Sequence, residues 1–171
     1  GVVGVPTETV YGLAALAFNT DAVSEIYRLK GRPANNPLIL HIHHQDQIGQ
    51  IATAVPDVLP QVLGAFWPGP LTVVLKSQKS VPEIVRAGGD TVAIRMPSHP
   101  VFKQVLTTIN EPLAAPSANP FTRVSPTSAQ HVADYFGDTV TVLDGGPCTV
   151  GLESTIVGFD GETPIIYRKG G

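Results

Sequence analysis

Three cationic side chains, Arg28, Lys30 and Arg32, lie within five positions where a helical pattern runs into Gly31 and Pro33. Glycine and proline in these places predict the end of a helix, so the cations are expected on a turn. Arginine on a turn can clamp phosphate oxygens bidentately, and lysine can do so as a point charge. The same charges would also complement the dipole of a helix C-terminus, and these residues alone leave both interpretations open.

Polar side chains also gather beside an expected strand that follows the basic turn. Asn35 and Asn36 precede an apolar run, residues 37–40, which is expected to form a buried strand ending at His41 and His43. Cations, amides and imidazoles are therefore carried on one turn and the strand after it.

Thr7 and Thr9 follow an expected strand at residues 2–5 and would share a face if that strand continued. They would then line a ligand cleft or be ordinary strand residues, and the pattern favours the second interpretation. The polar loop at residues 116–120 follows another expected strand, and open α/β sheets bind ligands at such loops.

An alternating strand is predicted at residues 91–95, with Val92 and Ile94 on one face and Thr91, Ala93 and Arg95 on the other. An arginine between β-branched core positions is not a typical surface charge. It is either part of a structural ion pair or faces an anionic ligand, and both alternatives need a partner for the charge.

The common nucleotide and metal motifs are absent. The sequence has no GxxxxGK[ST] loop and no GxGxxG after a strand. His41, His43 and His44 lack an HExxH motif or a Cys/His pairing, which favours a structural or substrate-contacting role over a zinc site, so no metal ligand is predicted from the protein. Cys148 has no nearby sign of a paired base and is not expected to be a nucleophile.

What remains is a set of side chains that bind anions and amides, namely Lys30, Arg32, Asn36, Arg95, Ser117, Asn119, Ser154 and Arg168. Such a set suits a reaction that depends on positioning and electrostatics, without a covalent protein intermediate. Phosphoryl and nucleotidyl chemistry fit this description best.

The elements that must position these residues alternate between helix and strand. Helices are expected at residues 21–29, 48–54, 58–66, 99–109 and 127–136, the last with Thr127 as N-cap. Strands are expected at residues 2–5, 37–43, 71–76, 91–95, 113–115, 140–143, 154–159 and 164–168. Because the last two strands have the pattern of a hairpin, the sequence predicts an α/β fold with a mixed sheet.

The composition limits the kinds of partner. The 171 residues suit one domain, and 43% hydrophobic with 15% charged residues indicates a well-buried globular chain. Eleven Lys and Arg against 14 Asp and Glu give a net charge of -3, so any anion site must be local. A single cysteine excludes an internal disulfide and favours a reducing, cytoplasmic setting.

The ends of the chain also carry expectations. No apolar run approaches the ~18 residues that span a bilayer, and no signal-peptide pattern opens the chain. The chain starts inside an expected strand and stops at Gly170 and Gly171, so we expect a fragment trimmed at both ends.

Six motifs in order resemble the Sua5/YrdC/YciO family: PTETVYGL at 6–13, KGRP with NPL at 30–38, WPGPLT at 67–72, DTVAIRMP at 90–97, APSAN at 115–119 and LEST at 152–155. The pairs Lys30 with Arg32 and Ser117 with Asn119 match the signature of the family. The resemblance implies a single YrdC-like domain over residues 1–171, a twisted, mostly mixed sheet with helices on its faces and a large, open, electropositive cleft.

The same resemblance implies the activity of an L-threonylcarbamoyladenylate synthase, a nucleotidyltransferase. L-Threonine, bicarbonate and ATP, with Mg²⁺, would give threonylcarbamoyl-AMP and pyrophosphate. A downstream transferase would then pass the threonylcarbamoyl group to adenosine 37 of tRNA (t6A), with weak or indirect contact between this chain and tRNA.

The resemblance also implies a role for each site residue, with Lys30 and Arg32 catalytic. Nucleotide binding is expected at Lys30, Arg32, Asn36, Thr91, Ser117, Asn119, Ser125 and Arg168. Threonine binding is expected at Thr9, His41, Arg95, the Ala115 main chain and Ser154, with Arg95 suited to the carboxylate.

Two departures and three alternatives accompany this resemblance. Family members begin with a helix before the first strand and usually read Arg-Pro-Gly where this chain has Arg168, Lys169 and Gly170. Longer members add a linker and a second domain. The alternatives are an RNA-binding YrdC-like module, a carbamoyl-adenylate-forming relative as in hydrogenase maturation proteins, and an inactive paralogue.

Overall fold

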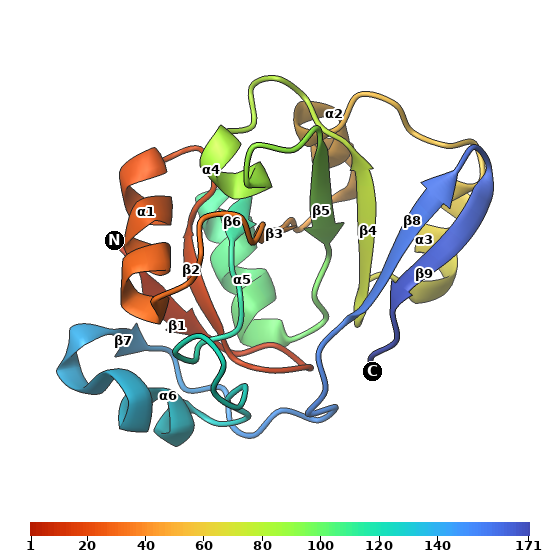
Figure 1. The fold of residues 1–171 in the computed structure, drawn as a ribbon. Helices are drawn as coiled ribbons and strands as arrows, with labels where there is room; N and C mark the ends of the chain where they lie inside the picture. Colours follow the sequence, from red (N-terminus) through yellow and green to blue (C-terminus); the bar gives the residue numbers. More distant parts are fainter.

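Nine short strands form one sheet in the computed structural model, which describes residues 1–171 (Figure 1). The strands are β1 (Val3–Val5), β2 (Gly12–Leu16), β3 (Ile39–His41), β4 (Leu71–Lys76), β5 (Thr91–Arg95), β6 (Leu113–Ala114), β7 (Thr141–Val142), β8 (Thr155–Asp160) and β9 (Thr163–Arg168). Their order in the sheet is β7-β1-β2-β6-β3-β5-β4-β8-β9.

The sheet is mixed, as the sequence predicted. Pairs β7/β1, β3/β5 and β4/β8 are parallel, whereas β1/β2, β2/β6, β6/β3, β5/β4 and β8/β9 are antiparallel. The expected hairpin of the last two strands is confirmed and forms one edge of the sheet (Figure 1). Strands distant in sequence therefore meet at the centre, where β3 lies between β6 and β5.

The helices are α1 (Thr20–Lys30), α2 (Ile48–Ile51), α3 (Leu59–Phe66), α4 (Glu83–Arg86), α5 (Pro100–Ile109) and α6 (Ala129–Phe136), with 3-10 turns at Gln45–Gln47 and Gly137–Thr139. None of them combines the length and apolarity that a membrane crossing requires. Figure 1 shows α6 beside β7 at one end of the sheet, and α3 at the opposite end near β8 and β9.

Helix α1 ends where the sequence predicted. The Asn19 side chain caps its start by accepting from the Ala22 main-chain N–H at 3.0 Å. Gly31 ends it with φ 60°, a left-handed conformation that glycine adopts without steric cost. The turn after Gly31 reverses the chain and places Arg32 beside the strand that follows.

The two faces of the sheet are covered unequally. Alternation on β5 is confirmed: Ile94 and its neighbours Leu40 and Val73 pack in a large core with residues of α1 to α4. On the opposite face, α5 packs through Phe102 and Leu106 against residues of β1, β2 and β6. The part of this second face on β3 and β5 is left for the site residues described below.

The segment after β1 differs from expectation. Residues 6–11 leave the sheet, because the Thr7 hydroxyl donates to the Val10 carbonyl at 2.6 Å and accepts from the main-chain N–H groups of Thr9 and Val10 at 3.1 Å. The strand therefore does not continue, so the condition under which Thr7 and Thr9 would share a strand face is not met, yet their hydroxyls lie 2.8 Å apart. Strand β2, which follows, was not predicted.

Several element boundaries also differ. The N-cap of α6 is Ser128, which accepts from the His131 N–H at 3.3 Å, so the prediction of Thr127 is wrong by one position. Helix α2 ends at Ile51, because Ala52 turns to an extended conformation and bridges Ser77. Both differences follow from contacts that the local pattern does not contain.

Candidate active site

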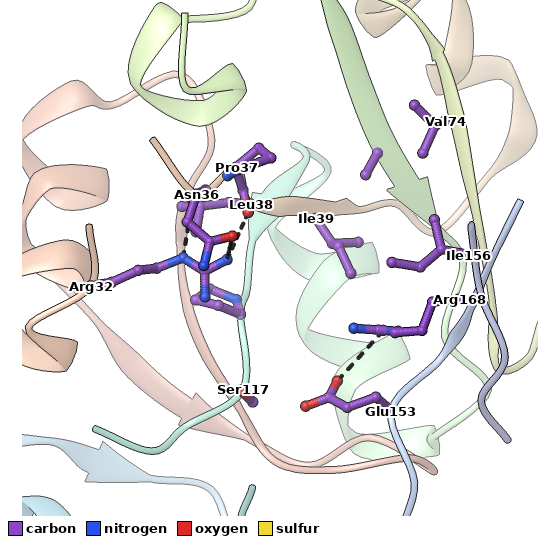
Figure 2. A pocket seen from close by; sticks show the side chains of 12 residues that line it. Arg32, Asn36, Pro37, Leu38, Ile39, Val74, Ser117, Glu153, Ile156 and Arg168 are labelled. Atoms are coloured by element: carbon purple, nitrogen blue, oxygen red, sulfur yellow. Dashed lines mark hydrogen bonds and ion pairs between the residues drawn. The ribbon is translucent and has the colours of Figure 1, made fainter. Parts of the chain in front are cut away.

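Two adjoining hollows lie on the face of the sheet that α5 leaves open. The first, which we call the outer hollow, has a volume of about 250 Å³ and is lined by Arg32, Asn36, Pro37, Leu38, Ile39, Val74, Ala93, Pro116, Ser117, Glu153, Ile156 and Arg168 (Figure 2). The second, the inner hollow, measures about 30 Å³ and is lined by Thr7, Thr9, Val10, Tyr11, Gly12, Ile39, His41, Arg95, Ala115, Pro116, Ser117, Glu153 and Ser154. They share the wall formed by Ile39, Pro116, Ser117 and Glu153.

The turn after α1 holds Arg32 on one side of the outer hollow. Its Nε donates to the Asn36 carbonyl at 3.0 Å, and its Nη2 donates to Asn36 Oδ1 at 2.9 Å and to the Pro37 carbonyl at 2.8 Å. These bonds fix the plane of the guanidinium and use three of its five N–H donors, so the two N–H groups of Nη1 remain for an anion.

Arg168 approaches the outer hollow from the opposite side, as Figure 2 shows. A register shift in the β8/β9 hairpin pairs Arg168 with Ile156. Its Nε and Nη2 donate to the Ser154 carbonyl at 3.0 and 2.8 Å. Two guanidinium groups on opposite walls give the outer hollow local positive charge in a chain whose net charge is -3.

Lys30 lies behind the hollows and lines neither of them. Its side chain is buried, and Nζ donates to the main-chain carbonyls of Ser117 at 2.5 Å and Asn119 at 2.6 Å. Burial, with a smaller contribution from Arg32, lowers the pKa of Lys30 to about 7. Lys30 thus positions the loop that carries Ser117 into both hollows.

Asn119 is buried in the same loop. Its Nδ2 donates to the carbonyls of Pro120 at 2.9 Å and Arg123 at 2.8 Å, and Oδ1 has no hydrogen-bond partner in the protein. The Ser-x-Asn pair therefore divides its roles, with Ser117 at the hollows and Asn119 holding the loop behind them.

Arg95 lies in the inner hollow and forms an ion pair with Glu8, with both side chains buried. It also donates from Nη1 to Thr9 Oγ1 at 2.8 Å and from Nε to the Gly69 carbonyl at 3.1 Å. Burial favours the neutral Glu8 carboxyl, but the charge and hydrogen bonds of Arg95 outweigh it, so the pKa of Glu8 is lowered. The structural ion pair is therefore present, and the arginine still lines the hollow.

His41 lines the inner hollow as a neutral imidazole. The ring packs against Phe102 with a centroid separation of 5.3 Å, and Nδ1 is buried without a hydrogen-bond partner. Burial, and to a smaller extent the charge of Arg95, lowers the pKa of His41 to about 3. The ring can hydrogen-bond a hydroxyl or amine of a ligand, but it adds no positive charge.

Ser154 completes the inner hollow together with the main chain of Ala115. Its hydroxyl lies 2.7 Å from Thr72 Oγ1, and its side chain is buried. All five residues expected at a threonine site, Thr9, His41, Arg95, Ala115 and Ser154, are therefore brought together around one small polar hollow.

Besides Lys30 and Asn119, two further residues expected at the nucleotide line neither hollow. Thr91 lines a neighbouring hollow of about 300 Å³ that shares only Val74 with the outer one. Ser125 lines neither hollow but donates to Glu153 Oε1 at 2.7 Å, so it contacts the shared wall from behind.

Sequence reasoning missed the two acids of the site. Glu8 lies within the PTETVYGL motif and Glu153 within LEST, but neither was assigned a role. A partner for Arg95 was expected without being identified, since a buried arginine requires one. The identity of that partner depends on a contact between residues 87 positions apart.

The fold and the site define an α/β protein that can hold an anionic ligand between two arginines, beside a small polar ligand. The sequence profile of the Sua5/YciO/YrdC family, described as telomere recombination, matches residues 1–170. This chain belongs to that family, which confirms the resemblance seen in its motifs.

Two relatives carry the name threonylcarbamoyl-AMP synthase. The protein of Pyrococcus abyssi is 44% identical over 171 residues and that of Bacillus subtilis 45% over 172 residues, each match covering 99% of this chain and 50% of the relative. The structure of P. abyssi Sua5 complexed with L-threonine superposes with a TM-score of 0.96, at 44% identity and the same coverage. The chain thus spans about half the length of these relatives.

The Glu8 and Arg95 pair generates a prediction for stability. Glu8→Ala leaves a buried guanidinium without its counter-ion and is expected to lower the free energy of unfolding by about 3–5 kcal/mol in urea denaturation. Combining it with Arg95→Met is expected to restore part of that loss. Glu25→Ala, which removes an exposed partner of Arg28, is the control and should change little. Equal losses of unfolding free energy in Glu8→Ala and Glu25→Ala would contradict this prediction.

His41 generates a prediction for pH dependence. Its pKa is about 3 in the fold and 6.5 in the unfolded chain, so below pH 6.5 the unfolded chain binds a proton that the folded chain does not. Because of His41, the free energy of unfolding therefore decreases as pH falls from 6.5 toward 3, by at most ~1.4 kcal/mol per pH unit. In His41→Gln that contribution is absent, so the stability gap to wild type should narrow on acidification. A constant gap between pH 7 and 4 in denaturation experiments would show that the pKa of His41 in the fold lies near 6.5 and would contradict this prediction.

Proposed function

We propose that this chain acts as an L-threonylcarbamoyladenylate synthase, converting L-threonine, bicarbonate and ATP into threonylcarbamoyl-AMP and pyrophosphate for t6A modification of tRNA. The observation that carries the proposal is the contact between an arginine-lined hollow and a small polar hollow through one shared wall. The names of the relatives and the threonine complex of one of them support the same assignment.

In this proposal the ATP phosphates occupy the outer hollow. Arg32, Arg168 and Ser117 contact them directly, with Asn36 holding the Arg32 guanidinium in place. Lys30 and Asn119 act as positioning residues through the loop that carries Ser117. A contribution from Thr91 requires the nucleotide to reach the neighbouring hollow, and one from Ser125 acts through Glu153.

L-Threonine occupies the inner hollow in this proposal. A volume of about 30 Å³ holds one or two waters, so part of the amino acid must extend past the shared wall toward the nucleotide. The three hydrogen bonds of Arg95 leave two of its five N–H donors for the carboxylate. His41, Thr9, Ser154 and the main chain of Ala115 offer the remaining polar contacts.

The arrangement brings the threonine amine to the nucleotide. The amine and bicarbonate give a carbamate with loss of water, and a carbamate oxygen attacks the α-phosphorus. The bond from that phosphorus to the bridging oxygen of pyrophosphate then breaks. Negative charge grows on the leaving pyrophosphate, and the guanidinium groups of Arg32 and Arg168 are held where they stabilise it before the reaction starts.

Mg²⁺ belongs to the proposal as a companion of ATP and not as a resident ion. No group of three or more His, Cys, Asp or Glu side chains in the chain is arranged to hold a metal, and Mg²⁺ usually binds through one or two carboxylates plus substrate phosphates. When bound, the ion neutralises charge on the phosphates. We place the reaction in the cytoplasm, with a downstream transferase as partner and only weak or indirect contact with tRNA.

Pyrophosphate release from ATP and bicarbonate, with each common amino acid added in turn, tests the proposal. Release is expected only with threonine, and Arg32→Ala should lower the rate by about 10²–10³-fold because it removes a preorganised charge from the transition state. Arg28→Ala is the matched control, since Arg28 is exposed and pairs only with Glu25.

Other outcomes of this experiment favour the alternatives. Release that requires carbamoyl phosphate in place of threonine and bicarbonate would identify a carbamoyl-adenylate-forming enzyme. No release with any substrate, together with retention of tRNA on a filter, would identify an RNA-binding module. Neither release nor retention would identify an inactive paralogue.

A further inference from the structure

Glu153 is the only carboxylate that lines either hollow, and it lies in the wall that the two share. It precedes β8 and faces Arg168 (Figure 2). The roles proposed above do not use this residue, and its negative charge repels the phosphates of ATP.

Glu153 is not a structural acid of the kind that Glu8 is. The oxygens of Glu8 are both engaged, Oε1 by Arg95 and Oε2 by the Ser98 main-chain N–H at 3.0 Å, and its side chain is 8% exposed. The side chain of Glu153 is 37% exposed, so it meets solvent and any ligand in the hollow.

The two oxygens of Glu153 differ in their partners. Oε1 accepts from the Ser125 hydroxyl at 2.7 Å, which orients the carboxylate. Oε2 has only Arg168 Nη2, at 3.9 Å, which is beyond hydrogen-bond distance. Arg168 makes its shorter bonds to the Ser154 carbonyl, so Oε2 retains acceptor capacity at the outer hollow.

Two arginines share the outer hollow with this carboxylate. Arg168 is its ion-pair partner, and Arg32 lines the opposite wall (Figure 2). A phosphate drawn in by these cations therefore meets one negative charge. That repulsion is removed if a divalent cation lies between the phosphate and the carboxylate.

We propose that Glu153 is the residue through which the site selects nucleotide that carries Mg²⁺ over nucleotide without it. In the absence of ligand, Arg168 is the counter-ion of Glu153. When the metal-bound nucleotide enters, Oε2 faces the metal ion or a water bound to it, and metal-free nucleotide is disfavoured by repulsion. The inference rests on the proposed function, since it requires a triphosphate in the outer hollow.

Titration calorimetry with ATP, in excess Mg²⁺ and in a chelator, tests the inference without measuring turnover. Wild type is expected to bind ATP more tightly with Mg²⁺. In Glu153→Gln, metal-free ATP should bind about tenfold more tightly, and the ratio of the two affinities should fall by at least about tenfold. Glu153→Asp keeps the charge and should keep the preference for the metal-bound form.

Glu111→Gln is the matched control, because it also replaces a carboxylate by an amide. Glu111 is exposed and lines neither hollow. It should leave both affinities unchanged, and thermal denaturation verifies that each variant is folded. An unchanged affinity ratio in Glu153→Gln, whether both affinities shift together or neither shifts, overturns this inference alone. If wild type binds ATP in neither condition, the proposed function fails and this inference fails with it.

Discussion

The site depends first on the ion pair between Glu8 and Arg95. It joins the loop after β1 to the centre of the sheet. Arg95 also donates a hydrogen bond to the Gly69 carbonyl, and Glu8 accepts one from the Ser98 main-chain N–H. Three segments distant in sequence, at residues 8, 69 and 95–98, therefore meet at one pair of buried charges. Such a pair is costly to desolvate and costlier to break, so the segments are held in a single arrangement. Two of these segments, the loop after β1 and the end of β5 at Arg95, also line the inner hollow.

Lys30 has the corresponding role for the outer hollow. A buried ammonium in contact with two main-chain carbonyls ties the end of α1 to the loop that carries Ser117. The neighbouring Arg32 is instead fixed by its own turn and faces the hollow. Lys30 and Arg32, two positions apart, thus have different roles, one inside the protein and one at the hollow. A binding role inferred from a Lys-x-Arg spacing alone does not separate them.

Local chemistry explains what the sequence could predict. The end of α1 at Gly31 was expected, because glycine adopts a left-handed conformation that other residues resist. Strands β4 and β5 have the predicted bounds, since β-branched apolar runs indicate strand directly. Strand β2, GLAAL, was missed because its small residues carry little strand preference and its pairing with β1 and β6 supplies the stability.

The site was predicted less completely than the fold. Motifs identified the residues around the two hollows, but the partners of Arg95 and the position of Glu153 depend on contacts across the sheet. Thr91 was expected at the nucleotide because it shares a face with Arg95, yet the two lie at opposite ends of β5 and open into different hollows. A shared face fixes the side of the sheet and not the distance along it.

Under the proposed function, the size of the inner hollow bears on which amino acids the site can reject. The inner hollow measures about 30 Å³ and adjoins the outer one at their shared wall, so it restricts only the part of a ligand that lies inside it. It offers no such barrier to a smaller ligand. An amino acid that lacks one methyl group loses only about 1–3 kcal/mol of contact, so serine is the competitor against which shape protects least. Fidelity toward threonine would then rest on how closely the wall packs around that single methyl group.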